Sequence, residues 1–176
     1  MRFVTILIFG LLAGCFALLF ELAIMTSSFP SIASTINFDT LFSFQAFTTL
    51  LIIASIEEIA KYIFLLRYTK YVPQKNNSSV FSLILLAFFF GLGFFSLELA
   101  LSLQSSPSFS LFATSRTLLL HISTSFLFIY FVFSPSDAEA GALSQTNRFL
   151  SQKSFWLVSG AVLLHLIYNI IVLLTT

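Results

Sequence analysis

Five stretches of 18 or more mostly apolar residues recur along this chain, each long enough to cross the ~30 Å hydrocarbon core of a bilayer. Only 9% of the residues are charged, against roughly 25% in soluble domains, so the chain cannot cover itself with a water-facing surface. The sequence predicts an all-α, polytopic membrane protein, a bundle of about five transmembrane helices in a single domain over residues 1–176. The predicted spans are residues 3–25, 41–66, 80–103, 112–133 and 155–174.

The distribution of Lys and Arg predicts the orientation of these spans, because cytoplasmic loops carry an excess of basic residues. Six of the basic residues fall on one side of a five-span arrangement: Arg2, Arg67, Lys70, Lys75, Arg148 and Lys153. The other side has Arg116. We therefore expect a multi-pass plasma-membrane protein with a cytoplasmic N-terminus and the C-terminus outside. A net charge of +1 gives no reason to expect a nucleic-acid partner.

The first span carries small residues on one helical face. Gly10, Gly14, Ala17 and Glu21 follow one another at intervals of four, three and four residues. Such a stripe indicates close packing against a neighbouring helix. Glu21 lies near the outer end of the span, and we expect it to reach interfacial water.

The second span holds Glu57, Glu58 and Lys61 in one sector of the helix, since Lys61 projects between the two glutamates. Three charges at mid-membrane oppose insertion by roughly 9 kcal/mol, and its fourteen Leu, Ile and Phe residues return about 6 kcal/mol. The polar face of this helix must therefore look inward, toward partners or a water-filled cavity.

Three other spans offer such partners. The third span carries Glu98, the fourth His121, and the fifth His165 and Asn169, four residues apart. At 1.5 Å per residue from the cytoplasmic ends, Glu57 and His165 lie at depths of about 14–15 Å and Glu98 at about 27 Å. Four helices thus each bring an ionisable side chain into the bilayer, with Glu98 offset in depth.

Carboxylates and imidazoles together can bind and activate water. A glutamate can take a proton from the water, and histidines can orient it, stabilise an oxyanion or ligate a metal. The chain has no Gly-x-Ser-x-Gly, no paired Asp and no His-Glu-x-x-His segment. The usual signatures of serine, cysteine and aspartyl proteolysis are therefore absent from the sequence.

In order along the chain, these residues resemble the motifs of PrsW-type intramembrane proteases. The segment from Glu57 to Lys61 resembles an EExxK motif, and that from Gly91 to Glu98 a GxxFxxxE motif. His121 stands where a single helix histidine is expected, and the segment from His165 to Asn169 resembles a closing HxxxN/D. The related superfamily of CAAX prenyl endopeptidases and bacteriocin-processing proteins has a similar set, but Lys61 and Glu98 favour the PrsW type.

The resemblance implies a membrane-embedded endopeptidase of glutamate or metallo type, acting on a membrane-protein or lipidated-peptide substrate within the lipid bilayer. We assign the general base to Glu57, support to Glu58, and to Lys61 the role of holding that pair. Asn169 would orient His165 or donate to the oxyanion. The remaining residues would position water or a metal, and zinc is the cofactor left open, with the candidate ligands Glu98, His121 and His165.

Two other functional classes stay open at this point. A proton-coupled carrier or channel would also place Glu and His inside the membrane, although the sequence has no internal repeat. A non-catalytic membrane scaffold would keep the same fold. Transport in liposomes would favour the carrier, and full function after Glu57→Gln would favour the scaffold.

Overall fold

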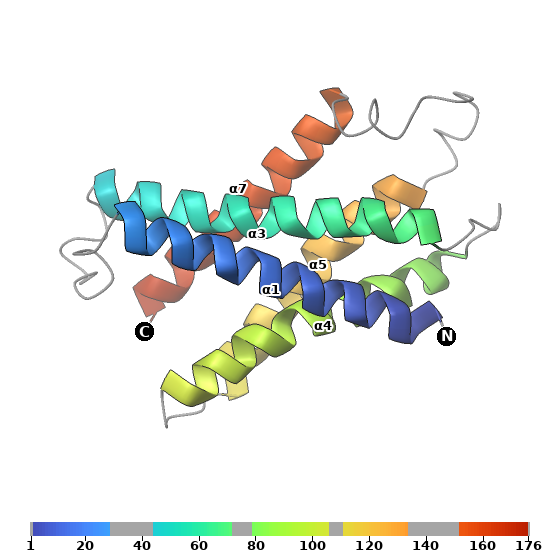
Figure 1. The fold of residues 1–176 in the computed structure, drawn as a ribbon, viewed down its shortest axis with the longest axis horizontal. Helices are drawn as coiled ribbons and strands as arrows, with labels where there is room; N and C mark the ends of the chain where they lie inside the picture. The colour runs from blue at the N-terminus through green and yellow to red at the C-terminus, as the bar shows by residue number, and fades with distance from the viewer. Residues whose placement is uncertain (1, 29–43, 72–78, 106–110, 134–151, 176) are drawn as a thin grey trace.

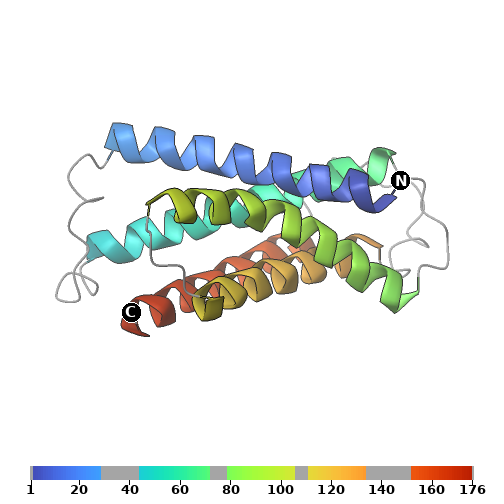
Figure 2. The ribbon, with the colours of Figure 1, turned by 90° about the horizontal axis from the view of Figure 1, so that it is seen from below.

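The computed structural model describes residues 2–28, 44–71, 79–105, 111–133 and 152–175. These residues form five long α-helices, with no strand among them: α1 (Arg2–Ser28), α3 (Phe44–Tyr71), α4 (Val80–Ser105), α5 (Leu111–Phe133) and α7 (Gln152–Thr175). The helices pack into a single bundle (Figures 1 and 2). The predicted all-α membrane fold is confirmed.

Four of these helices are long and apolar enough to cross a membrane: α1, α4, α5 and α7. Helix α3 has the length, since its 28 residues rise about 42 Å, but it carries the charged side chains. It packs against α1, α5 and α7, which shield its polar face. The chain is an integral membrane protein whose most polar helix is enclosed by its neighbours.

Helix α3 runs to Tyr71, five residues past its predicted end at 66. Arg67, Thr69 and Lys70 suggested a loop, but polar residues at a membrane interface do not interrupt a helix. Neither Gly nor Pro occurs in this segment to do so. Helix α4 begins as predicted at Val80, where the backbone N–H of Ser82 donates to Ser79 Oγ (3.3 Å), as at a helix N-cap.

The exterior and interior of the bundle have the polarity of a membrane protein. Large apolar side chains are exposed on the outside, among them Phe81, Phe112, Leu119 and Trp156. The buried polar and charged residues are Thr49, Glu58, Lys61, His121, Thr124, Ser125, Ser154 and His165. Lipid tails can cover the exterior, whereas many of the buried polar groups bond to one another inside, among them Lys61 with Glu58 and Thr124.

Helix α4 lies between α1 and α5 because glycines remove side chains at both contacts. A Cβ on Gly93 would collide with the backbone carbonyl of Leu7 in α1, and one on Gly91 would lie 2.9 Å from Ile122 Cα in α5. Gly10 of α1 likewise faces the backbone carbonyl of Phe90. The Gly-Leu-Gly segment therefore allows two neighbouring helices to approach the α4 backbone, as expected for small residues in membrane helices.

Candidate active site

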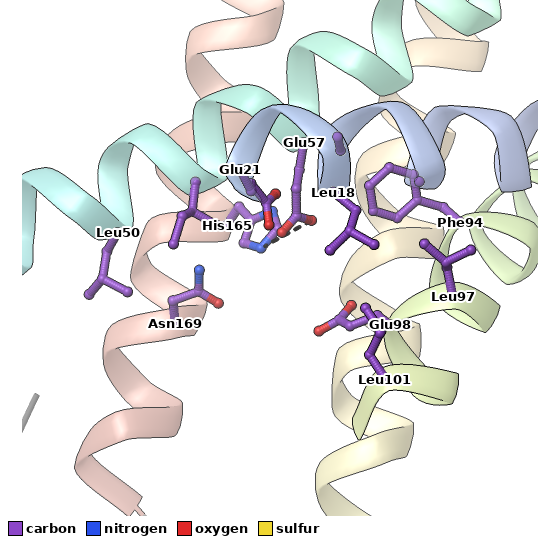
Figure 3. A pocket seen from close by; sticks show the side chains of 13 residues that line it. Leu18, Glu21, Leu50, Glu57, Phe94, Leu97, Glu98, Leu101, His165 and Asn169 are labelled. Atoms are coloured by element: carbon purple, nitrogen blue, oxygen red, sulfur yellow. Dashed lines mark ion pairs between the residues drawn. The ribbon is translucent and has the colours of Figure 1, made fainter. Parts of the chain in front are cut away.

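The charged face of α3 has an ion pair at its centre. Lys61 Nζ lies 2.6 Å from Glu58 Oε1, and neither side chain is exposed. The ammonium also donates to Thr124 Oγ1 (3.2 Å) and lies 4.6 Å from the centre of the Phe94 ring. Lys61 was expected to hold both glutamates, but it pairs with Glu58, while Glu57 points into a cavity (Figure 3).

Glu58 also orients His165. The Nδ1 atom of His165 lies 2.7 Å from Glu58 Oε1, the same oxygen that accepts from Lys61. Since the paired carboxylate is an acceptor, the imidazole Nδ1–H donates to it. A neutral His165 then carries its lone pair on Nε2, which lies 3.8 Å from Glu57 Oε2. The hydrogen bond to Glu58 thus fixes both the ring orientation and the nitrogen that is free to react.

A second imidazole–carboxylate pair joins α5 to α4. His121 Nε2 lies 2.6 Å from Glu98 Oε2, with His121 buried and the Glu98 side chain half exposed. The ring of His121 packs against Phe94 and Phe95 at centroid distances of 5.0 and 6.2 Å. It lies 5.7 Å from the ring of His165. The two imidazole–carboxylate pairs are therefore neighbours.

The depth offset counted for Glu98 does not separate it from the other residues. Figure 1 shows α4 and α7 crossing obliquely behind or beneath α1 and α3. The helix ends account for part of the offset, because α3 continues to Tyr71 and α7 begins at Gln152. Glu57 and His165 therefore lie about 20 Å along their helices, rather than about 14–15 Å, against about 27 Å for Glu98. Glu98 contacts His121, the His121 ring neighbours that of His165, and His165 bonds to Glu58, so the four helices that carry these residues converge at one place.

The converging side chains surround a cavity of about 310 Å³ between α1, α3, α4 and α7. Its apolar lining includes leucines of all these helices except α7. Its polar lining consists of Glu21, Glu57, Glu98, His165 and Asn169. Figure 3 shows Glu57 and His165 on one wall and Glu98 on the other. The cavity is large enough to hold several water molecules.

The predicted site residues divide into two groups by their access to this cavity. Glu57, Glu98, His165 and Asn169 line it. Glu58, Lys61 and His121 are buried behind that lining. Each cavity residue of the two imidazole–carboxylate pairs therefore has a buried partner: Glu58 holds His165, and His121 holds Glu98.

Glu57 and Asn169 both face the cavity with polar side-chain atoms. The Glu57 side chain is 14% exposed, and its Oε2 has no hydrogen-bond partner among the described residues. The Asn169 carboxamide lies at the cavity wall one turn beyond His165 (Figure 3). Because the hydrogen bond of His165 Nδ1 goes to Glu58, Asn169 is left to face the cavity.

Glu21 is the cavity residue that sequence reasoning placed elsewhere. It was expected to reach interfacial water, whereas it lines the cavity together with Gly14 and Ala17. The stripe of small residues ending at Glu21 was the available signal, because the helix face that packs closely is also the face that looks inward. Which neighbour that face meets could not be read from the stripe.

The predicted metal ligands Glu98, His121 and His165 are chemically suited to zinc, which binds carboxylate oxygen and imidazole nitrogen. As placed, His121 Nε2 and Glu98 Oε2 contact each other directly, and His165 Nε2 faces Glu57. Across the described helices, no three His, Cys, Asp or Glu side chains are arranged to hold a metal ion. The donor types fit a metal, but their arrangement does not.

Comparison with known proteins identifies the family of the chain. A family model described as "PrsW family intramembrane metalloprotease" matches residues 3–176. No curated protein and no solved structure matches the chain. The family match covers nearly the whole chain and confirms the resemblance drawn from the four ordered motifs. The chain therefore belongs to the PrsW family of intramembrane metalloproteases.

Proposed function

We propose that the chain hydrolyses a peptide bond within or beside a membrane segment of a protein or lipidated-peptide substrate, using water activated by Glu57. The observation that carries this proposal is a Glu57 carboxylate oxygen that accepts no hydrogen bond and lies beside His165 Nε2 at the wall of a cavity within the bundle. A carboxylate without a hydrogen-bond donor is available to accept a proton from water.

In the first step, a water molecule lies between Glu57 and His165 Nε2 and attacks the carbonyl carbon of the scissile bond. Glu57 accepts one proton of this water as its oxygen bonds to carbon. The Glu58–Lys61 ion pair keeps His165 in the tautomer that leaves Nε2 free to accept a hydrogen bond from the water.

The oxyanion that forms needs a donor, and Asn169 offers an amide N–H from the same helix as His165. On the opposite wall, Glu98 can accept a backbone N–H of the substrate while His121 holds the carboxylate in place. Each buried partner thus acts through a cavity residue, as supporting groups in preorganised active sites do.

The central test is Glu57→Gln in purified protein reconstituted in lipid and presented with a screen of membrane-segment peptides. We expect cleavage to fall by about 10²–10⁴, because the amide retains the size but cannot accept the proton. The Glu57→Gln protein should still fold, because Lys61 pairs with Glu58 and not with Glu57. Near-normal cleavage by this variant would remove Glu57 from the chemistry, and the same result for both Glu57→Gln and Glu58→Gln would remove α3 as the catalytic helix.

Whether the protein uses a zinc ion can be tested directly. The metal content of the purified protein is measured, and its cleavage activity is compared before and after chelation. Loss on chelation with recovery in zinc would require that the side chains rearrange around a metal. Unchanged cleavage by metal-free protein would support the activation of water by Glu57 alone.

For orientation, we propose a plasma-membrane protein with the N-terminus in the cytoplasm and the C-terminus outside. Arg2, Arg67, Lys70 and Lys153 lie at the start of α1, the end of α3 and the start of α7. A hydrogen bond from Tyr68 Oη to the Arg2 carbonyl (3.4 Å) joins the first two of these ends. Lys75 and Arg148, which also entered the prediction, lie outside the described residues.

A further inference from the structure

Glu21 is an ionisable residue of the cavity that the proposed mechanism does not use. It projects into the cavity from α1, whereas the four segments that resemble PrsW motifs lie on α3, α4, α5 and α7. Within the described helices its carboxyl group makes no hydrogen bond or ion pair, yet it interacts electrostatically with Glu57 and Glu98. A carboxyl group in a membrane interior is costly, so one without a structural partner calls for a functional explanation.

The position of Glu21 follows from the packing of α1 on α4. A Cβ on Gly14 would lie 3.1 Å from the backbone oxygen of Phe94, and Ala17 is buried in the same stripe. This close contact brings the next turn of α1, with Glu21, to the cavity wall. The stripe thus aims a carboxyl group at the site as well as joining two helices.

Peptide hydrolysis also needs a proton donor for the departing amine, because an amide nitrogen is a poor leaving group without one. Apart from Glu57, which takes the proton of the attacking water, the other donors of the site are engaged: Lys61 is bound to Glu58 and Thr124, and His165 Nδ1–H donates to Glu58. Glu98 is in contact with His121. Glu21 has no such commitment.

The geometry points to Glu21 as the general acid that protonates the leaving amine, an inference that rests on the proposed function. After water has bonded to the carbonyl carbon and given a proton to Glu57, the C–N bond breaks. The nitrogen takes a proton from the Glu21 carboxyl group as the carbonyl re-forms. Glu57 then holds the proton that Glu21 has lost.

The same cavity allows the site to return to its starting state. A proton passes from Glu57 to Glu21, directly or through a water molecule of the cavity, and restores a carboxylate at Glu57 and a carboxylic acid at Glu21. The net reaction consumes one water and yields one acid and one amine. Two carboxyl groups on different helices can therefore exchange acid and base roles within a turnover.

The test compares amide and ester cleavage. A peptide that the reconstituted wild-type protein cleaves is resynthesised with an ester at the scissile position, since an alkoxide leaves more readily than an amine without a proton. Glu21→Gln should lower kcat for the peptide by about 10²–10⁴ while kcat for the ester falls by less than about tenfold. Glu21→Asp should recover part of the peptide cleavage, and Glu57→Gln should lose both activities.

Retained ester cleavage also shows that the Glu21→Gln protein is folded. Equal loss of both activities, or peptide cleavage within about twofold of wild type, would overturn the acid role and leave the proposed function standing; the second outcome would mean that protonated Glu57 supplies the proton itself. If wild-type protein cleaves no peptide while remaining folded, the proposed function fails and this inference fails with it.

Discussion

Replacing Lys61 by Met should destabilise the protein strongly, because it leaves a buried carboxylate without its cation. Lys61 and Glu58 are both fully buried and 2.6 Å apart, and removing one partner of such a pair typically costs about 3–5 kcal/mol. Glu58 keeps its bond to His165, which favours the lower end of that range. Met fills most of the lysine volume, so little of the loss would come from a cavity.

Lys61→Met would also remove the contacts of Lys61 with Thr124 and Phe94. A desolvated cation over an aromatic ring contributes up to about 2 kcal/mol, and a hydrogen bond in a membrane protein about 0.6 kcal/mol. These contributions overlap with the ion pair, because one ammonium group makes all three contacts. We therefore expect a free energy of unfolding lowered by about 3–5 kcal/mol in total.

Reversible unfolding in mixed micelles of increasing SDS content measures this quantity, followed by far-UV circular dichroism and by the fluorescence of Trp156, the single tryptophan. Lys70→Met is the matched control, because Lys70 is exposed at the end of α3, and it should change stability by less than about 0.5 kcal/mol. In the Glu58→Gln/Lys61→Met double variant the loss should be smaller than the sum of the single losses. A Lys61→Met protein within about 1 kcal/mol of wild type would refute the buried ion pair.

Two further predictions concern helix packing and orientation. Gly93→Ala should lower stability by about 1–3 kcal/mol in the same unfolding assay, because the added Cβ would force α1 away from α4. Gly160→Ala, whose Cβ would meet nothing within 4 Å, should be neutral or stabilising, and equal losses at the two glycines would contradict the close α1–α4 contact. The orientation can be tested with single cysteines introduced in a Cys15→Ala background and treated in intact cells with a membrane-impermeant thiol reagent. We expect cysteines at positions Asn77 and Ser144 to be protected and one at Ser106 to be labelled. The reverse labelling pattern would invert the proposed topology.

The spans and the membrane location could be predicted from the sequence, because the length of an apolar stretch and the thickness of a bilayer are both local quantities. The helix ends differ mainly at α3, where polar interfacial residues continue the helix to Tyr71. The inward direction of Glu57, Glu58 and Lys61 could also be predicted, because exposing a charged side chain to lipid is costly however the helices are arranged.

The partners of these side chains depended on tertiary structure. The spacings Glu57–Lys61 and Glu58–Lys61 are both favourable along a helix, so sequence alone could not choose between them. Packing against α5 and α7 decided the choice, because Thr124 holds the ammonium and His165 donates to the same Glu58 oxygen. Glu57 was left free for the cavity.

The same distinction explains Glu98 and Glu21. Counting residues separated Glu98 from Glu57 and His165 in depth, partly because α3 and α7 extend beyond their predicted ends and partly because counting cannot include the inclination of α4 to α3 (Figure 1). The small-residue face of α1 could be identified from the sequence, but such a face predicts only that some helix packs closely, not which one. The three-dimensional packing of α1 on α4 is what carries Glu21 to the cavity, since the position of a side chain across a bundle depends on the crossing of two helices and on no property of either helix alone.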